Sequence, residues 1–181
     1  MSDKRFKLPA IVSDHDLERI IAYTTTDNCL QNLHDALILV ANTGLRRGEL
    51  AGLRWSDVDL DERSLVVSGL RRSTRHAFFS ESIGAILLAR RQRNPEAELV
   101  FGPLTRVERL GWHLRRVSQE LGIECTFQTL RRSFAKRLFD SGVDAPVACH
   151  VLGVSYDCEF EHHGVPAEAT LKRAAESLGE I

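Results

Sequence analysis

Two stretches of the sequence combine paired arginines with a turn-forming glycine and acidic residues, a combination suited to holding an anion. They are TGLRRGELAGLRWSDVD, Thr43 to Asp59, and QTLRRSFAKRLFDSGVDAPVACHVLG, Gln128 to Gly153. Arginine presents a planar fork of N–H donors that matches the oxygens of a phosphate group. Of the 24 basic residues, 20 are arginine and four are lysine. The sequence therefore indicates binding of phosphate groups.

A third stretch, LGVSYDCEFEHHGV from Leu152 to Val165, begins at the end of the second one and carries candidate nucleophiles. A tyrosine hydroxyl, here that of Tyr156, or a histidine imidazole, here that of His163, can attack phosphorus and form a covalent intermediate. The cysteines and histidines around them lack the paired spacing of a zinc knuckle. We therefore expect no metal site and no cofactor.

The charges of the chain are unevenly distributed. The formal net charge is −1, but residues 155–181 hold six acids and two bases, a net of −4, which leaves +3 on residues 1–154. Hydrophobic residues make up 43% of the chain, as in globular proteins. We find no run of about 18 apolar residues and no signal peptide, so we expect a cytoplasmic protein with no membrane segment and with reduced cysteines.

The periodicity of apolar residues predicts a mostly α domain with a small antiparallel sheet (α+β). Residues 106–121 show the helical spacing most clearly, and Trp112 within them is expected to pack in the core. Two β-rich runs around LRRST predict the sheet, near residues 55–80, and residues 98–103 could add an edge strand. The other expected helices are residues 13–24, 33–42, 46–53, 82–93, 128–141, 145–152 and 166–178.

At the two arginine stretches the chain resembles the tyrosine recombinase (phage integrase) family, in its catalytic domain. The family's first motif reads roughly T-G-L-R-x-x-E-L-x-x-L-x-W-x-D-(I/V), and residues 43–58 fill every position. The second reads H-x-L-R-H-(T/S)-F-A, then G-(V/A)-(D/S), then L-G-H, and residues 128–154 keep its spacing without its histidines. The resemblance covers about residues 13–178. It implies the family's fold and an attack by a tyrosine hydroxyl on a DNA phosphodiester.

The resemblance also implies roles for single residues. Arg46 and Arg131 stand where the family's two arginines hold the phosphate oxygens, and Glu49 stands where an acid braces the first of them. The family's two histidine positions, which assist proton transfer, are occupied by Gln128 and Val154. The phosphate-holding side chains are therefore kept, whereas the proton-handling ones are replaced.

A lysine on the sheet's hairpin, expected from the family near residues 69–72, is absent from the sequence GLRRST. Arg71 and Arg72 can supply charge there, but arginine, with a pKa above about 12, is a poor proton donor. We expect these two residues, with Arg75 on the same hairpin and Arg132 in place of a further histidine, to contact DNA phosphates.

The family's spacing places its tyrosine nucleophile at His163, and Tyr156 lies about seven residues before that position. At roughly 1.5 Å per helical residue, this displacement amounts to about 10 Å. The sequence therefore leaves open whether the chain is an enzyme.

Three functions follow from these observations. The first is a protein that binds double-stranded DNA, is linked to DNA integration and site-specific recombination in a mobile element, and is weak or inactive in strand cleavage. The second is an active recombinase that uses Tyr156 as a displaced nucleophile. The third is a protein-interaction domain that no longer binds DNA. The DNA target and the oligomeric state do not follow from the sequence.

The expected organisation is a lead-in segment, residues 1–12, followed by one domain of the catalytic type, residues 13–181. We expect no N-terminal core-binding domain in this chain. The C-terminal helix, residues 166–178, is a candidate for self-association or for contact with a partner recombinase.

Overall fold

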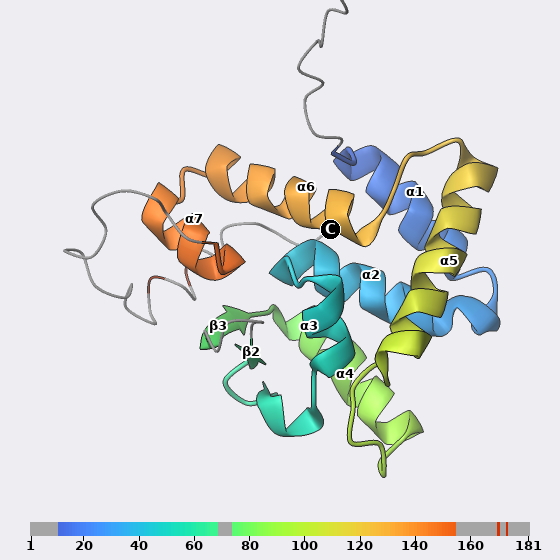
Figure 1. Cartoon of the computed structure of the whole chain (residues 1–181), viewed down its shortest axis with the longest axis horizontal. Coiled ribbons are helices and arrows are strands. Elements are labelled where there is room, and N and C mark those ends of the chain that lie inside the picture. The colour runs from blue at the N-terminus through green and yellow to red at the C-terminus, as the bar shows by residue number, and fades with distance from the viewer. Residues whose placement is uncertain (1–10, 69–73, 155–169, 171–172, 174–181) are drawn as a thin grey trace, which may run out of the picture.

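A computed structural model describes residues 11–68 and 74–154, together with Thr170 and Arg173. The described chain is mostly helical with a three-stranded antiparallel sheet, which confirms the predicted fold class (Figure 1). The helices are α1 (Asp14–Thr24), α2 (Gln31–Thr43), α3 (Arg47–Gly52), α4 (Glu81–Arg93), α5 (Leu104–Leu121), α6 (Phe127–Asp140) and α7 (Ala145–Leu152). The described residues also form two 3₁₀ turns, η1 (Asn28–Leu30) and η2 (Trp55–Asp57), and the strands β1 (Val58–Asp59), β2 (Ser64–Ser68) and β3 (Thr74–Phe78).

Helix α2 lies at the centre of the fold and packs against α1, α4, α5 and α6 (Figure 1). Its sequence is apolar on nearly every side, and Leu33, Leu37 and Val40 are fully buried. A helix that is hydrophobic all round is stable only when it is covered all round. No helix in the described part of the chain is long and apolar enough to cross a membrane.

The sheet forms where the sequence predicted it, near residues 55–80, in the order β1-β2-β3. Strands β2 and β3 pair antiparallel, with Leu65 opposite Ala77 and Val67 opposite Arg75. The possible edge strand at residues 98–103 is reduced to one bridge, between Arg54 and Leu99. The predicted helix 166–178 lies outside the described residues except for Thr170 and Arg173, which are helical.

Helix α5 buries the predicted apolar face, which includes Val107, Leu110 and Leu114. The prediction that Trp112 packs in the core is wrong, because 55% of its surface is exposed. Residues two apart on a helix point to different sides. Trp112 is two residues from both Leu110 and Leu114, so its side chain faces away from the buried face. The helix therefore presents an aromatic ring to the solvent.

A second, smaller apolar cluster joins β3 to α6 and α7. It contains Phe78 of β3, Phe134 and Leu138 of α6, and Val147 and Val151 of α7. Figure 1 shows α7 beside β3, next to the end of α2. This cluster holds α7 against β3 and α6.

The N-terminal end of the described chain is attached to α6. Val12 is buried in the main core, and its backbone N–H donates a 2.8 Å hydrogen bond to the Ser133 hydroxyl. Val12, expected in the lead-in segment, thus already belongs to the folded part.

Gly44 ends α2 and is required there for two reasons. Its φ of +64° lies in the left-handed region that side chains rarely adopt. A Cβ at this position would also lie 2.5 Å from Cδ1 of Phe134 and 3.3 Å from Leu152. The turn between α2 and α3 is therefore shaped by the second apolar cluster as well as by local conformation.

Replacing Gly44 with alanine should destabilise the protein more than replacing Gly122, which ends α5 with a φ of +67° but has no atom within 4 Å of its Cβ position. We expect G122A to cost about 1–2 kcal/mol from backbone strain. G44A adds overpacking and should lose about 1–3 kcal/mol more. Urea unfolding of the two variants measures the difference, and equal losses would contradict the packing role of Gly44.

Candidate functional site

Glu49 lies in the first turn of α3 and binds groups from two parts of the chain. Its Oε2 accepts a 2.8 Å hydrogen bond from the backbone N–H of Arg46, and its Oε1 accepts one of 2.9 Å from Nη1 of the same residue. Nη2 of Arg75, from strand β3, donates to Oε2 at 2.8 Å. The Glu49 side chain is only 5% exposed. One buried carboxylate thus fixes both the backbone and the guanidinium of Arg46.

Two carbonyls at the C-terminal end of α7 accept hydrogen bonds from Arg46 and Arg131. Nη2 of Arg46 donates to the carbonyl of Gly153 at 2.6 Å, and Nη2 of Arg131 donates to that of Leu152. Nη1 of Arg131 binds the carbonyl of Gly44. The last carbonyls of a helix lack partners within it and carry partial negative charge, so they suit cations. Arg46 and Arg131 therefore converge on neighbouring carbonyls.

Arg75, which was predicted to contact DNA phosphates from the hairpin, is instead buried. Its side chain is 6% exposed and points inward to Glu49. Position 75 lies on the same face of β3 as the buried Ala77, two residues along the strand, and this period of two is the sequence signal that could have placed it inside. Arg71 and Arg72, expected on the same hairpin, lie outside the described residues.

The site carries three guanidinium groups and one carboxylate, a net of two positive charges, in the described chain. Burial, and then the positive charges of Arg46 and Arg75, lower the pKa of Arg131 to about 10. Burial also lowers the pKa of Arg75, and Glu49 opposes this shift. With a pKa of about 10, Arg131 is charged at neutral pH, and the net positive charge of the site favours an anion.

His150 is a titratable group near this site for which the sequence predicted no role. It is half-buried on α7, four residues before Val154. Burial lowers the pKa of His150, and the charges of Arg75 and His76 lower it further. These effects favour the neutral form of the imidazole.

A surface cleft of about 490 Å³ opens beside Arg46. Arg47 and Gln128 line it with Arg46, and Trp112 and Arg115 of α5 also line it. Gln128, at the first histidine position of the family motif, thus shares the cleft with the first arginine.

The remaining site positions are distributed as follows. Val154 is 42% exposed and directly follows Gly153, and Arg132 is exposed on α6 next to the buried Arg131. Tyr156 and His163, the two candidate nucleophiles, lie outside the described residues. The structure therefore brings together Arg46, Glu49 and Arg131 with Arg75, which was predicted as a DNA-binding residue, and it places Gln128 at the cleft beside Arg46.

Comparison with known proteins agrees with this arrangement. Residues 11–156 match the model of the phage integrase family. Tyrosine recombinase XerA of Thermococcus kodakarensis is 30% identical over 158 residues, which cover 82% of this chain and 55% of that protein. The chain thus spans about half the length of the curated relatives it matches.

Solved structures of recombinases share the fold. The integrase from mycobacterium phage Brujita matches with a TM-score of 0.76 and 21% identity, over 96% of this chain and 59% of that one. The Tn1549 transposon integrase in complex with circular intermediate DNA matches with a TM-score of 0.72 and 18% identity, over 97% of this chain and 67% of that one. With the family match over residues 11–156, these findings establish that the chain belongs to the phage integrase family, the tyrosine recombinases.

Proposed function

We propose that this chain binds double-stranded DNA in DNA integration or site-specific recombination and is weak or inactive in strand cleavage. The observation that carries the proposal is the cluster of Arg46, Arg75 and Arg131 around Glu49, which is the one carboxylate of this cluster among the described residues. Buried positive charge that exceeds the nearby negative charge is costly unless an anion neutralises it. The phosphodiester backbone of DNA is the anion that a member of this family meets.

The cleft beside Arg46 supports the same ligand. Arg47 and Arg115 line it together with Arg46, against one acid, Glu108. Arginine side chains of this kind supply the phosphate contacts that orient a protein on a duplex. The Tn1549 integrase, which shares this fold, was solved in complex with circular intermediate DNA, which supports DNA as the ligand here.

Further parts of the proposal rest on the sequence. We propose that Arg71, Arg72 and Arg132 add phosphate contacts, that residues 13–181 act as one domain, and that the helix 166–178 serves self-association. A mobile element is the proposed origin of the chain, by resemblance to integrases.

Weak cleavage follows from the residues at the proton-handling positions. Gln128 and Val154 cannot donate or accept a proton at neutral pH, and the hairpin lysine is missing. The loss of one general acid costs about 10²–10⁴ in rate. The arginines that remain stabilise charge on phosphorus, but they supply neither a nucleophile nor a proton for the leaving oxygen.

DNA binding should be steeply dependent on salt, and the cleft arginines should carry part of that dependence. Replacing Arg47 and Arg115 together with alanine should reduce the slope of log K against log salt by about 1.8, since each phosphate contact contributes about 0.9. Fluorescence anisotropy with a labelled duplex, over a series of salt concentrations, measures the slope.

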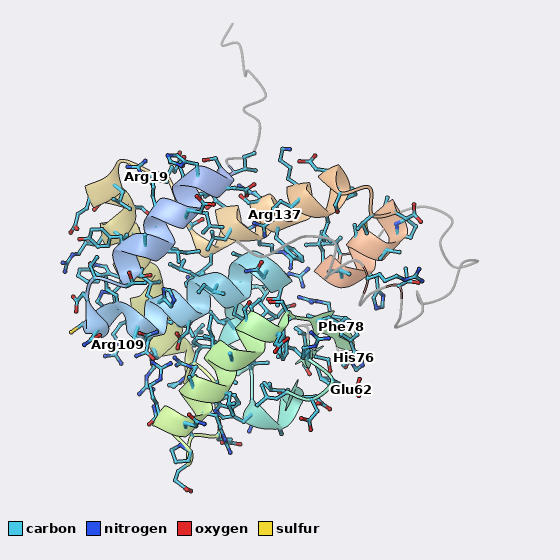
Figure 2. All side chains as sticks on the ribbon, turned by 180° about the vertical axis from the view of Figure 1, so that it is seen from behind. Arg19, Glu62, His76, Phe78, Arg109 and Arg137 are labelled. Atoms are coloured by element: carbon cyan, nitrogen blue, oxygen red, sulfur yellow. The ribbon has the colours of Figure 1, made fainter. Side chains whose placement is uncertain are left out.

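Arg19 provides the control, because it is a half-exposed arginine on α1 and is not among the described residues that line the cleft (Figure 2). Arg19→Ala should leave the slope nearly unchanged. A slope that is the same in the double variant and the parent would remove the cleft from the DNA interface. No binding at low salt would favour a protein-interaction domain.

The chain should form little or no covalent DNA adduct. The test incubates it with a nicked suicide duplex and looks for a complex that survives denaturant. An adduct that disappears in Tyr156→Phe would contradict the proposal and establish a displaced tyrosine nucleophile. An adduct that disappears in His163→Ala would contradict it in favour of a phosphohistidine.

A further inference from the structure

An aromatic ring lines the cleft beside Arg46, among side chains that suit phosphate. Trp112 is 55% exposed, and of the exposed large apolar side chains in the described chain it is the one that lines this cleft. Helix α5 packs against α3, which brings Trp112 into the same cleft as Arg46 and Arg47. Apolar surface that stays in water forgoes the free energy of burial. A ligand that covers the indole ring would therefore gain affinity from it.

The cleft residues of α5 form one stripe along the helix. Glu108, Gly111, Trp112 and Arg115 follow one another at spacings of three, one and three residues, so they share a face. Glu108 and Arg115 are seven residues apart, which is about 10 Å along the helix axis, and Trp112 lies between them. This face therefore offers, in order, an acidic acceptor, an aromatic ring and a donor for phosphate.

Gly111 keeps space open beside the ring. It lies within α5 and has no positive φ, so the backbone there does not require glycine. Outside the helix itself, a Cβ at this position would meet only Cε2 of Phe127, at 4.0 Å, so packing does not require glycine either. Glycine within a helix is less stable than alanine. What the missing side chain provides is room in a cleft of about 490 Å³, a volume typical of sites for small ligands.

A nucleotide with an unstacked base has the chemistry that these side chains recognise. Arginines bind the phosphate, and an aromatic side chain stacks on the base. A carboxylate accepts a hydrogen bond from an exocyclic amino group such as that of cytosine. Glu108 would repel a second phosphate, which argues against a cleft filled by the DNA backbone alone. In a fully paired duplex the neighbouring bases cover both faces of each base, so a side chain can stack only on a base that has left the stack.

We propose that this cleft holds one unpaired nucleotide of a DNA strand, with its base against Trp112 and its phosphate on Arg47 and Arg115. The inference rests on the proposed function in taking DNA as the ligand, and it adds the state of that DNA. Strand exchange between two duplexes requires bases to leave one stack before they pair in another. Trp112 replaces the lost stacking partner, and Gly111 leaves the space for it.

The test compares two labelled duplexes by fluorescence anisotropy, one with a single unpaired cytosine and one of the same sequence that is fully paired. The parent chain should prefer the first, because stacking of one base on an aromatic side chain changes affinity by about 5–150-fold. Trp112→Ala should lose this preference and bind the paired duplex nearly as the parent does. Trp112→Phe keeps an aromatic ring and should retain most of the preference. Phe139→Ala is the control, because Phe139 is a similarly exposed ring of α6 that does not line the cleft.

Gly111→Ala tests the same space without removing the ring. The added methyl group narrows the cleft and should weaken binding of the duplex with the unpaired cytosine. Alanine also favours the helix, so G111A should resist urea better than the parent, and weaker binding would not result from unfolding. Gly84→Ala is its control, because Gly84 lies within α4, does not line the cleft, and would place its Cβ at an ordinary 3.5 Å from Phe79.

Tryptophan fluorescence gives a direct readout, because the chain has two tryptophans, Trp55 and Trp112. The duplex with the unpaired cytosine should quench the fluorescence of the parent and much less that of W112F, which retains Trp55 alone. Equal affinity of the parent for the two duplexes, or a preference that persists in W112A, would overturn the inference and leave the proposed function standing.

Two further outcomes separate this inference from the proposed function. A parent chain that binds the unpaired nucleotide through Trp112 but does not bind the paired duplex would contradict the proposed function and support the inference. No binding of either duplex at low salt would overturn both.

Discussion

A single buried carboxylate, that of Glu49, joins the start of α3 to strand β3 and sets the position of two arginines. It binds the backbone and side chain of Arg46 and the side chain of Arg75. Removing one partner of a buried ion pair costs about 3–5 kcal/mol, because the other charge stays buried without compensation. Because two cations bind this one anion, the loss of Glu49 should weaken both the N-terminal cap of α3 and the attachment of β3 to α3.

The packing of a small apolar cluster completes the same site. Phe134 and Val151 belong to the cluster that holds α7 on α6 and β3, and α7 ends at Gly153 with its last carbonyls on Arg46 and Arg131. Gly44, beside Phe134, turns the chain from α2 into α3. The geometry of a polar site is thus set by apolar contacts, and the rigid close packing of such contacts keeps the guanidinium groups convergent.

The sequence predicted the parts of this structure that depend on local pattern. The stripe of Val107, Leu110 and Leu114 predicted α5, and the arginine motifs selected Arg46 and Arg131. The burial of Arg75 was missed, because it depends on a partner 26 residues away, and an arginine beside two others suggests an exposed loop. Trp112 departs from the prediction because its apolar ring suggests burial, whereas its position, two residues from both Leu110 and Leu114, points away from the buried face of α5.

The direct test of the role of Glu49 is the phosphate affinity of Glu49→Gln, measured by calorimetry against Glu98→Gln. Both variants remove one negative charge, and Glu98 is an exposed acid paired with Arg54. If Glu49 acted only through its charge, its removal would strengthen anion binding. Because we infer that it positions Arg46 and Arg75, E49Q should instead bind phosphate at least about tenfold more weakly, by the loss of charge-assisted contacts, with E98Q unchanged. Unchanged or tighter binding by a folded E49Q would contradict this account.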